Sequence, residues 1–337
     1  MSGNPTGSSR LARTQIIGTG SYAPEKVLTN ADLEKLVDTT DAWITERTGI
    51  RKRRVAAPGE TTSDMAVQAA RRALEMAGVR AEELGLIVVG TVTPDMPMPS
   101  CAAVVQAKLG AKNAFAFDVS AACSGSLYAL TVADQFIRTG QVKRALVIGA
   151  EMLSRAVNWD DRNTCVLFGD AAGAMVIAPS EDESRGLLST NLYTDGSFAE
   201  ILCIPGGGTS KPPCEEVLKE KLHTLHMNGR EVFKFAVRAL ADSTVTALKS
   251  NGLHARDVDH VIAHQANIRI LEAVLQRLEL PVEKCWLNLH EYGNTSSASL
   301  PMTLDEANRA GRLKQGDVVA MMAIGAGMTW GSAVMRW

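Results

Sequence analysis

The sequence of 337 residues predicts an α/β fold made of two pseudo-symmetric halves, each a mixed sheet covered by helices. One observation is an internal repeat, in which residues 73–90 align without a gap with residues 247–264 and Gly78 falls opposite Gly252. In both copies the glycine ends a helical stretch, and a short acidic link leads into an apolar run. The other observation is that these apolar runs are continuous, as strands covered on both faces require.

The repeat extends over two further units. Residues 114–126 match residues 285–297, and each segment is predicted to be a strand followed by a helix start. Residues 137–150 match residues 308–326 as a helix, a glycine turn and a buried strand. Three successive matching units favour a duplicated fold over a chance likeness between two ordinary βαβ segments.

The predicted elements follow in chain order. Buried strands are expected at 86–92, 145–150, 172–178, 260–264 and 318–326. We predict a loose tail over residues 1–13, an N-terminal half over residues 14–185 and a C-terminal half over residues 186–337. The glycine- and proline-rich segment 205–213 is predicted to be a loop.

Composition argues against several classes of protein. The formal net charge of −2 gives no overall attraction to nucleic acid, so an anionic partner needs a local basic patch. No apolar run reaches the roughly 18 residues of a membrane span, and the N-terminal segment lacks the apolar centre of a signal peptide. None of the six cysteines forms a CxxC pair and the histidines complete no zinc spacing, so no metal site is predicted. A chain of this size does not depend on disulfides, which favours the reducing cytoplasm.

Cys123 is the first candidate for chemistry. It lies between the apolar run 114–119 and a helical stretch of small residues that begins near Ser124. Free N–H groups at a helix start stabilise a thiolate, so we expect them to lower the pKa of Cys123. Small neighbours leave the sulfur open to a substrate, and the motif by itself leaves a packed core thiol as the alternative.

Two residues of the second half are predicted to face Cys123. In the repeat, Gly293 and Asn294 fall opposite Cys123 at an equivalent helix start. His264 ends a predicted strand, which is where ligands bind in α/β folds. Each has a plain alternative, because His264 suits a cap of the next helix and Asn294 suits an ordinary N-cap. Together the three residues predict a nucleophile with two hydrogen-bond donors beside it.

The chain resembles the β-ketoacyl-acyl carrier protein synthase III family, which has the five-layered αβαβα fold of the thiolases. The resemblance runs from about residue 14 to Trp337. It depends on seven motifs in the order of the family, TDAWITERTGIRKRR (40–54), DVSAACSG (118–125), DRNTCVLFGDAAGAMVI (161–177), MNGREVFKFAV (227–237), AHQANIRI (263–270), YGNTSSASLP (292–301) and AIGAGMTWGSA (323–333). Any one of these motifs is suggestive, and the ordered set is specific.

The resemblance implies a reaction in two steps that needs no cofactor. Acyl-CoA acylates Cys123, and malonyl-acyl carrier protein then loses CO₂ so that its enolate attacks the acyl group, which initiates fatty-acid synthesis. The backbone N–H groups of Cys123 and Ala326 are implied to bind the tetrahedral oxyanion. Ala326 stands where a run of glycines is common, which a backbone donor tolerates if its φ is negative. His264 Nε2 and the Asn294 amide are implied to stabilise the enolate.

The resemblance also implies a CoA site. Trp43 and Arg162 would clamp the adenine between an indole face and a guanidinium plane. Arg47 and Thr48 would lie near the phosphates, and Asn267 would bind the pantetheine arm. Without the family, a tryptophan at position 43 suits a core anchor equally well.

Further implied contacts concern the acyl group and the partners. Lys234 and Arg269 would form a basic approach for the acidic carrier protein. The basic run 51–54 is either a solvated face or an attraction for phosphate. Phe168 would line the acyl pocket, and Met98 occupies a position that reaches into the partner subunit's pocket in dimeric relatives, often as phenylalanine. A homodimer is therefore implied, and the acyl primer stays open.

Two other hypotheses remain. A relative recruited to secondary metabolism would use the same residues for condensation or acyl transfer. An inactive scaffold on the same fold is the other, and the intact Cys123, His264 and Asn294 argue against it. Asn294 also argues against chain-elongating condensing enzymes, because these carry two histidines.

Overall fold

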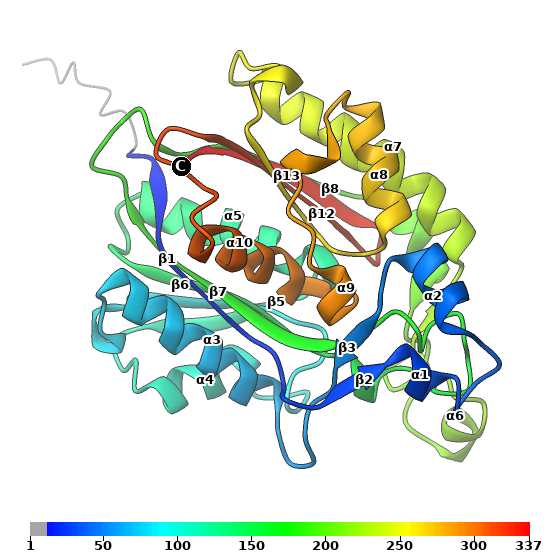
Figure 1. Ribbon diagram of the computed structural model, residues 1–337. Coiled ribbons are helices and arrows are strands. Elements are labelled where there is room, and N and C mark those ends of the chain that lie inside the picture. Colours follow the sequence, from blue (N-terminus) through cyan, green and yellow to red (C-terminus); the bar gives the residue numbers. More distant parts are fainter. Residues whose placement is uncertain (1–11) are drawn as a thin grey trace, which may run out of the picture.

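The computed structural model describes residues 12–337, whose helices and strands form five layers (Figure 1). Helices α5 (Gly125–Arg138) and α10 (Ser299–Arg309) lie between two sheets and form the central layer. The outer faces of the sheets are covered by α3 (Thr62–Ala77) and α4 (Cys101–Leu109) on the first and by α7 (Gly229–Lys249) and α8 (Ile268–Arg277) on the second. This arrangement is the predicted αβαβα fold.

The two sheets have the same order of strands. The first has the order β1-β7-β6-β4-β5 and the second the order β8-β13-β12-β11. The strands are β1 (Thr14–Tyr22), β4 (Leu86–Gly90), β5 (Phe115–Val119), β6 (Ala145–Met152), β7 (Asp170–Pro179), β8 (Gly186–Thr194), β11 (His260–Ala263), β12 (Val318–Gly325) and β13 (Thr329–Arg336). In each sheet the first two pairings are antiparallel and the next is parallel. The matching order and direction confirm the predicted duplication.

The second sheet lacks a counterpart of β5. Cys285 makes a single isolated parallel bridge with Val261, and the chain continues into the short helix α9 (Leu289–Tyr292). The prediction of a strand at the start of residues 285–297 is therefore wrong. The Gln265 side chain takes the backbone groups that a ladder would use, because it accepts from Asn288 N at 3.1 Å and donates to Trp286 O at 3.1 Å.

Successive residues of each buried strand pack against different layers. Leu86 and Val88 of β4 belong to the cluster around α5 and α10, whereas Ile87 and Val89 belong to the cluster beneath α3 and α4. This alternation explains why the runs are apolar without a break. The predicted strands match the observed ones within two residues at each end, and the apolar run that begins at Leu86 ends as a strand at Gly90.

The starts of the two central helices meet in the middle of the molecule. A Cβ atom on Gly149 would lie 2.1 Å from Ser297 O, and one on Gly90 would lie 2.4 Å from Gly125 C. Only glycine permits these approaches, because any larger residue would push the helix starts away from the strands. The strand ends and both helix starts therefore share one junction between the halves.

Each central helix follows a 3₁₀ turn of the same kind. These turns are η2 (Ala122–Ser124) before α5 and η7 (Ser296–Ala298) before α10. Each begins with a residue of positive φ, 45° at Ala122 and 50° at Ser296. This correspondence places Ser297, rather than Gly293 or Asn294, opposite Cys123, because the sequence alignment carried no information on the turn geometry.

The remaining elements lie outside the layers. They are β2 (Val27–Thr29) paired with β3 (Lys52–Arg54), β9 (Leu202–Cys203) paired with β10 (His226–Met227), and the short helices α1 (Asn30–Leu33), α2 (Asp41–Thr48) and α6 (Glu215–Lys219). Segment 205–213 contains neither helix nor strand, as predicted. The predicted tail at residues 1–13 lies, up to residue 11, outside the described residues.

No helix within residues 12–337 combines the length and the apolar character that crossing a bilayer requires.

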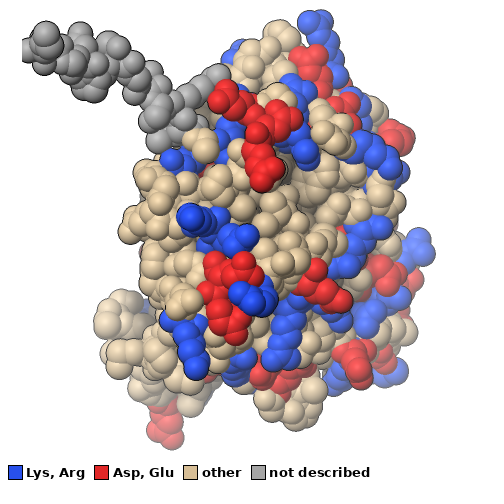
Figure 2. All heavy atoms as spheres, turned by 90° about the vertical axis from the view of Figure 1, so that its left-hand side faces the viewer, with Lys and Arg blue, Asp and Glu red and all other residues tan. Residues whose placement is uncertain are grey.

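On the face shown in Figure 2, acidic and basic side chains are interspersed. The structure therefore shows no continuous basic area on that face.

Candidate active site

Cys123, His264 and Asn294 line one cavity of about 120 Å³ at the junction of the two halves. Their exposed fractions are only 8%, 3% and 7%. Phe168 lines the same cavity and forms an isolated bridge with Asn294, which links the loop before β7 to the Asn294 loop. Residues that are 171 positions apart, from Cys123 to Asn294, thus share a single site.

The Cys123 thiol is held in its neutral form. Burial raises the pKa of Cys123 to about 12, the nearby Ser296 hydroxyl opposes the rise, and the charge of Glu151 adds to it. The predicted lowering of this pKa is therefore wrong. Removal from water destabilises the thiolate more than the N–H groups at the helix start stabilise it. The Cys123 nitrogen lies against Gly325, where a Cβ atom would come within 2.6 Å.

A serine sets the tautomer of His264. Ser299 Oγ lies 2.6 Å from His264 Nδ1, donates to Ser296 O at 2.8 Å and accepts from Gln265 N at 3.3 Å. A hydroxyl has one proton, so Ser299 accepts from His264 Nδ1–H. Burial lowers the pKa of His264 to about 4, which leaves the ring neutral with Nε2 unprotonated. The implied Nε2–H donor therefore requires that the ring first gains a proton.

Asn294 is oriented by its own turn. Its Oδ1 accepts from Ser296 N at 2.8 Å, and its backbone N–H donates to Leu167 O at 2.8 Å. Because the carbonyl end of the amide is held in this way, the NH₂ end is the one left for the cavity. The plain N-cap interpretation does not apply, since Asn294 lies two residues before η7 begins.

Acid should destabilise the folded protein through His264. The unfolded state gains a proton below the ordinary pKa of 6.5 whereas the folded state waits until about 4, so stability is lost as pH falls through this window. The difference corresponds to about 3 kcal/mol. The unfolding free energy of wild type should therefore drop between pH 7 and pH 4. In His264→Asn we expect this drop to be smaller by about 3 kcal/mol. Urea titrations at both pH values measure this, and equal losses in the two proteins would contradict the assignment.

Two further cavities open onto the site. An apolar one of about 280 Å³ is lined by Cys123, Ala326, Ser296 and Phe168, together with Val92, Ala122, Leu153, Leu202, Cys203, Ile204 and Leu225. The other, of about 650 Å³, shares Leu167, Met227, Gly229, Phe233 and Asn267 with the site and extends to Trp43, Arg47 and Arg269. The sulfur therefore lies between a basic cavity, called the outer cavity below, and an apolar cavity.

Trp43 and Arg162 lie together, but no slot separates them. Arg162 Cζ is 4.7 Å from the Trp43 ring centroid, and Arg47 Cζ is 4.8 Å from it. A base stacked between two planes needs a separation of about 7 Å. Arg162 is also bonded to Asp38 O at 2.7 Å, so the clamp is closed in this structure.

Two other residues of the implied CoA site serve the backbone. Thr48 lines the outer cavity, but its hydroxyl donates to Ile44 O at 2.6 Å. Asn267 caps α8, accepting from Arg269 N at 2.9 Å and donating to Arg47 O at 3.0 Å. Both side chains lie at the mouth of the site with their polar groups already engaged.

Two cations of the basic run 51–54 are engaged by neighbouring groups of the protein. Arg53 is completely buried and donates to Val166 O at 2.8 Å and Asn30 Oδ1 at 2.9 Å. Lys52 pairs with Glu291 at 2.8 Å. Charge alone did not reveal that these side chains join β3 to its neighbours.

The implied partner contacts lie at different places. Lys234 and Arg269 are exposed and line the outer cavity, and Lys234 pairs with Glu231 at 2.9 Å. Met98 is 85% exposed and lies outside the residues that line the three cavities. Ala326 lines the apolar cavity beside Cys123 and keeps a negative φ.

Sequence reasoning missed Glu151, Ser296 and Ser299. Glu151 is an acid near the carboxyl end of a buried strand, which was an available signal. Ser296 and Ser299 lie in the same motif as Asn294, where only the asparagine was singled out. Within residues 12–337, no cluster of three or more potential metal ligands is present.

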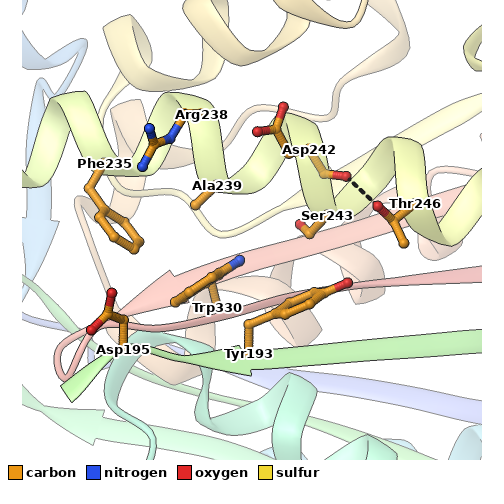
Figure 3. A pocket seen from close by; sticks show the side chains of 9 residues that line it. All are labelled: Tyr193, Asp195, Phe235, Arg238, Ala239, Asp242, Ser243, Thr246 and Trp330. Atoms are coloured by element: carbon orange, nitrogen blue, oxygen red, sulfur yellow. Dashed lines mark hydrogen bonds between the residues drawn. The ribbon is translucent and has the colours of Figure 1, made fainter. Parts of the chain in front are cut away.

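A separate hollow of about 270 Å³ lies between α7 and the edge of the second sheet (Figure 3). Tyr193 and Trp330 stack below the helix with centroids 5.5 Å apart, and Arg238 and Asp242 project from α7 above them. None of the predicted site residues lines it. The hollow is therefore not part of the site around Cys123.

Comparisons with known proteins agree with this geometry. Family models described as 3-oxoacyl-[acyl-carrier-protein (ACP)] synthase III and its C terminal match residues 117–196 and 248–337. A β-ketoacyl-[acyl-carrier-protein] synthase III of Caldanaerobacter subterraneus subsp. tengcongensis is 53% identical over 322 residues, 96% of this chain and 97% of the relative.

Solved structures extend the likeness. The 3-oxoacyl-[acyl-carrier-protein] synthase III of Aquifex aeolicus VF5 matches with a TM-score of 0.89 and 49% identity over 96% of this chain and 100% of that one. The priming β-ketosynthase of the R1128 polyketide pathway matches with a TM-score of 0.89 and 34% identity over 98% and 99%. The chain therefore belongs to the β-ketoacyl-[acyl-carrier-protein] synthase III family of condensing acyltransferases and has its thiolase-like fold.

Proposed function

We propose that this protein condenses an acyl group from acyl-CoA with malonyl-acyl carrier protein, giving 3-ketoacyl-acyl carrier protein, CoA and CO₂, and so initiates fatty-acid synthesis. The observation that supports this most directly is the convergence of Cys123, His264 and Asn294 on one cavity. The outer basic cavity suits a phosphate-bearing thioester, and the apolar cavity suits its acyl group.

In the first step Cys123 is the nucleophile. The thioester that it forms divides one difficult transfer into two easier ones. The N–H groups of Cys123 and Ala326 bind the tetrahedral oxyanion, and such a donor typically contributes about 3 kcal/mol. Phe168 and the rest of the apolar cavity then hold the acyl chain away from water.

In the second step Asn294 stabilises the enolate that decarboxylation creates. Its amide donates without titrating, and Ser296 N holds the other end. His264 acts with it once Nε2 carries a proton, which negative charge on the incoming malonyl group favours against the cost of burial.

In the outer cavity Trp43, Arg47 and Arg162 bind the adenine and phosphates of CoA. The close contact of Arg162 with Trp43 means that the arginine moves aside when the base enters. Thr48 lies beside Arg47 near the phosphates, and Asn267 lies beside the pantetheine arm.

Lys234 and Arg269 attract the acidic carrier protein to the outer cavity. We expect the double variant Lys234→Glu, Arg269→Glu to lower the rate with malonyl-acyl carrier protein by about tenfold at low salt, with a smaller loss at high salt. The matched control is Arg312→Glu, Lys314→Glu, two exposed cations elsewhere on the chain. An unchanged rate at low salt would remove these residues from the docking site.

The protein acts as a homodimer. The edge strand β5 offers unpaired backbone groups, and Phe115 and Phe117 stack on it with centroids 6.4 Å apart although Phe115 is 42% exposed. A free apolar edge of this kind pairs readily with a second copy. The exposed Met98 then lies free to reach the partner subunit's acyl pocket. We expect Phe115→Glu to shift the mass measured by light scattering from dimer to monomer, and Phe233→Glu, on the exposed side of α7, to leave it unchanged.

The reaction chemistry needs only sulfur and hydrogen bonds, so we propose no resident cofactor. All six cysteines are free thiols, which supports the cytoplasm as the compartment. The net charge of −2 supports small-molecule and carrier-protein partners in place of nucleic acid. We propose residues 14–185 and 186–337 as the two structural halves.

A second candidate is the priming of a secondary-metabolite pathway by the same chemistry. The apolar cavity of about 280 Å³ is large for an acetyl group, and the polyketide priming enzyme is similar over nearly the whole chain. A panel of acyl-CoAs decides between these candidates through the preferred chain.

The test of the function uses the purified protein. Each acyl-CoA is added and an adduct on Cys123 is sought by mass spectrometry, after which malonyl-acyl carrier protein is added and the ketoacyl product is measured. We expect an adduct on Cys123 and a product two carbons longer. Labelling at another residue, or no labelling with any donor, would overturn the proposal.

A further inference from the structure

Glu151 is a fully buried acid beside the site that the proposed reaction leaves without a role. It lies on β6 with no exposed surface. Its carboxylate accepts from Val92 N at 3.1 Å and from Thr93 Oγ1 at 2.5 Å. Among residues 12–337, no lysine, arginine or histidine forms an ion pair with it. A buried acid without a cation is costly to ionise, and groups perturbed in this way cluster at functional sites.

The Ser296 hydroxyl connects this acid to the nucleophile. Ser296 Oγ donates to Glu151 Oε1 at 3.5 Å, a long contact that a bound substrate can shorten. The same hydroxyl is near enough to the Cys123 sulfur to lower the pKa of the thiol against the larger effect of burial. Cys123 and Ser296 line the apolar cavity together, and Val92, which also lines it, is bonded to the carboxylate. The Ser296 hydroxyl therefore lies between the sulfur, with which it shares a cavity, and the carboxylate, to which it donates.

We propose that Glu151 takes up the Cys123 proton through the Ser296 hydroxyl during acylation, an inference that rests on the proposed function. The thiol proton passes to Ser296 Oγ as the Ser296 proton passes to Glu151. The sulfur of Cys123 then bonds to the acyl carbon, and the bond from that carbon to the CoA sulfur breaks. Both sulfurs are attached to one carbon in the tetrahedral intermediate, so the same hydroxyl returns the proton to the departing CoA sulfur.

The number of buried charges favours Glu151 over His264 as the proton acceptor. Transfer from Cys123 to ionised Glu151 moves one negative charge within the site, whereas transfer to His264 creates two buried charges from none. The pKa values agree, since burial raises that of Cys123 to about 12 and that of Glu151 to about 7, and lowers that of His264 to about 4. The pKa of Cys123 is therefore closer to that of Glu151 than to that of His264. Near neutral pH, Glu151 is thus poised to accept a proton.

Other titratable groups near β6 are engaged elsewhere. Burial raises the pKa of Cys101 on α4, and the charges of Asp118, Asp95 and Glu151 add to the rise. The Asp118 carboxylate accepts from Cys101 N and Ala102 N at 2.7 Å each. Asp170 on β7 is held by Ala56 N and the Ser154 hydroxyl. Within residues 12–337, none of these groups hydrogen-bonds the Ser296 hydroxyl, which donates to Glu151.

The test is Glu151→Gln, with two rates measured against pH. One is single-turnover acylation of Cys123 by acetyl-CoA or a longer acyl-CoA, and the other is alkylation of Cys123 by iodoacetamide, which needs no acyl donor. In wild type both rates should rise as pH passes through about 7. In Glu151→Gln the rise should disappear, and acylation at pH 7.5 should fall roughly 100-fold.

Controls separate proton transfer from structure. Thr93→Val removes a hydrogen bond to the carboxylate but keeps the acid, so it should retain the rise, and Glu151→Asp should restore part of it. If Glu151→Gln does not fold, Ser296→Ala must lose the rise, because it leaves the acid but removes the connecting hydroxyl. Retention of the rise in Glu151→Gln or Ser296→Ala, or an equal loss at every pH, would overturn the inference. A different result would overturn the proposed function alone. In it, no acyl-CoA acylates the wild-type protein, but the rise of iodoacetamide alkylation with pH is present in wild type and absent in Glu151→Gln.

Discussion

Cys123→Ala is expected to abolish covalent acylation and to lower acyl transfer from CoA by roughly 10³-fold or more. The reason is that no other group in the cavity shared with His264 and Asn294 is a nucleophile of comparable strength. Intact-protein mass spectrometry after addition of acyl-CoA measures the loss directly. The variant keeps His264 and Asn294, so slow decarboxylation of the malonyl donor without condensation should persist.

Cys203→Ala is the matched control for this experiment. Its thiol lines the same apolar cavity of about 280 Å³ as Cys123, but it lies on β9 away from His264 and Asn294. This variant should form the adduct at nearly the wild-type rate. An adduct that forms in Cys123→Ala but not in Cys203→Ala would show that Cys203, and not Cys123, is the nucleophile.

Asn294→Ala should separate the two halves of the reaction. Acylation of Cys123 should continue, because the oxyanion donors Cys123 N and Ala326 N are untouched. Decarboxylation should fall by about 10²- to 10³-fold, which is the usual effect of removing one preorganised donor. Adduct formation and CO₂ release, measured in separate assays, report the two steps.

Asn294→Asp tests the loss of the NH₂ donor separately from the loss of the hydrogen bond that holds the turn. It keeps an oxygen to accept from Ser296 N, which lies 2.8 Å from Asn294 Oδ1, but it replaces the NH₂ group by a second oxygen. We expect the same loss of decarboxylation as in the alanine variant. Equal loss of acylation and decarboxylation in both variants would contradict the division of roles between Cys123 and Asn294.

Much of the fold was predictable because its signals are local. Leu86 to Val89 pack against helices on both faces, and that requirement alone makes the run apolar. The repeat was visible because both halves bury the same pattern of strands and helices. The segment at Cys285 was predicted wrongly because the Gln265 side chain, distant in the sequence, takes its backbone hydrogen bonds.

The site was predictable in its residue types and less so in its electrostatics. Cys123, His264 and Asn294 were found because each follows a strand end or begins a turn in a motif of small residues. The pKa of Cys123 was predicted in the wrong direction, since a helix start is a local feature but burial is not. Arg53 likewise has the charge of a surface residue and the environment of a core residue.

The order of residues along the chain determined which segments become strands and helices, that the fold is duplicated, and which residues we propose for the chemistry. These properties follow from side-chain periodicity and from turn residues, which act over a few positions. Tertiary structure alone decided which groups are removed from water, which hydroxyl donates to Glu151, and which nitrogen of His264 holds its proton. The physical reason is that desolvation and hydrogen-bond partnership depend on what packs around a group in space, and those neighbours come from distant parts of the chain.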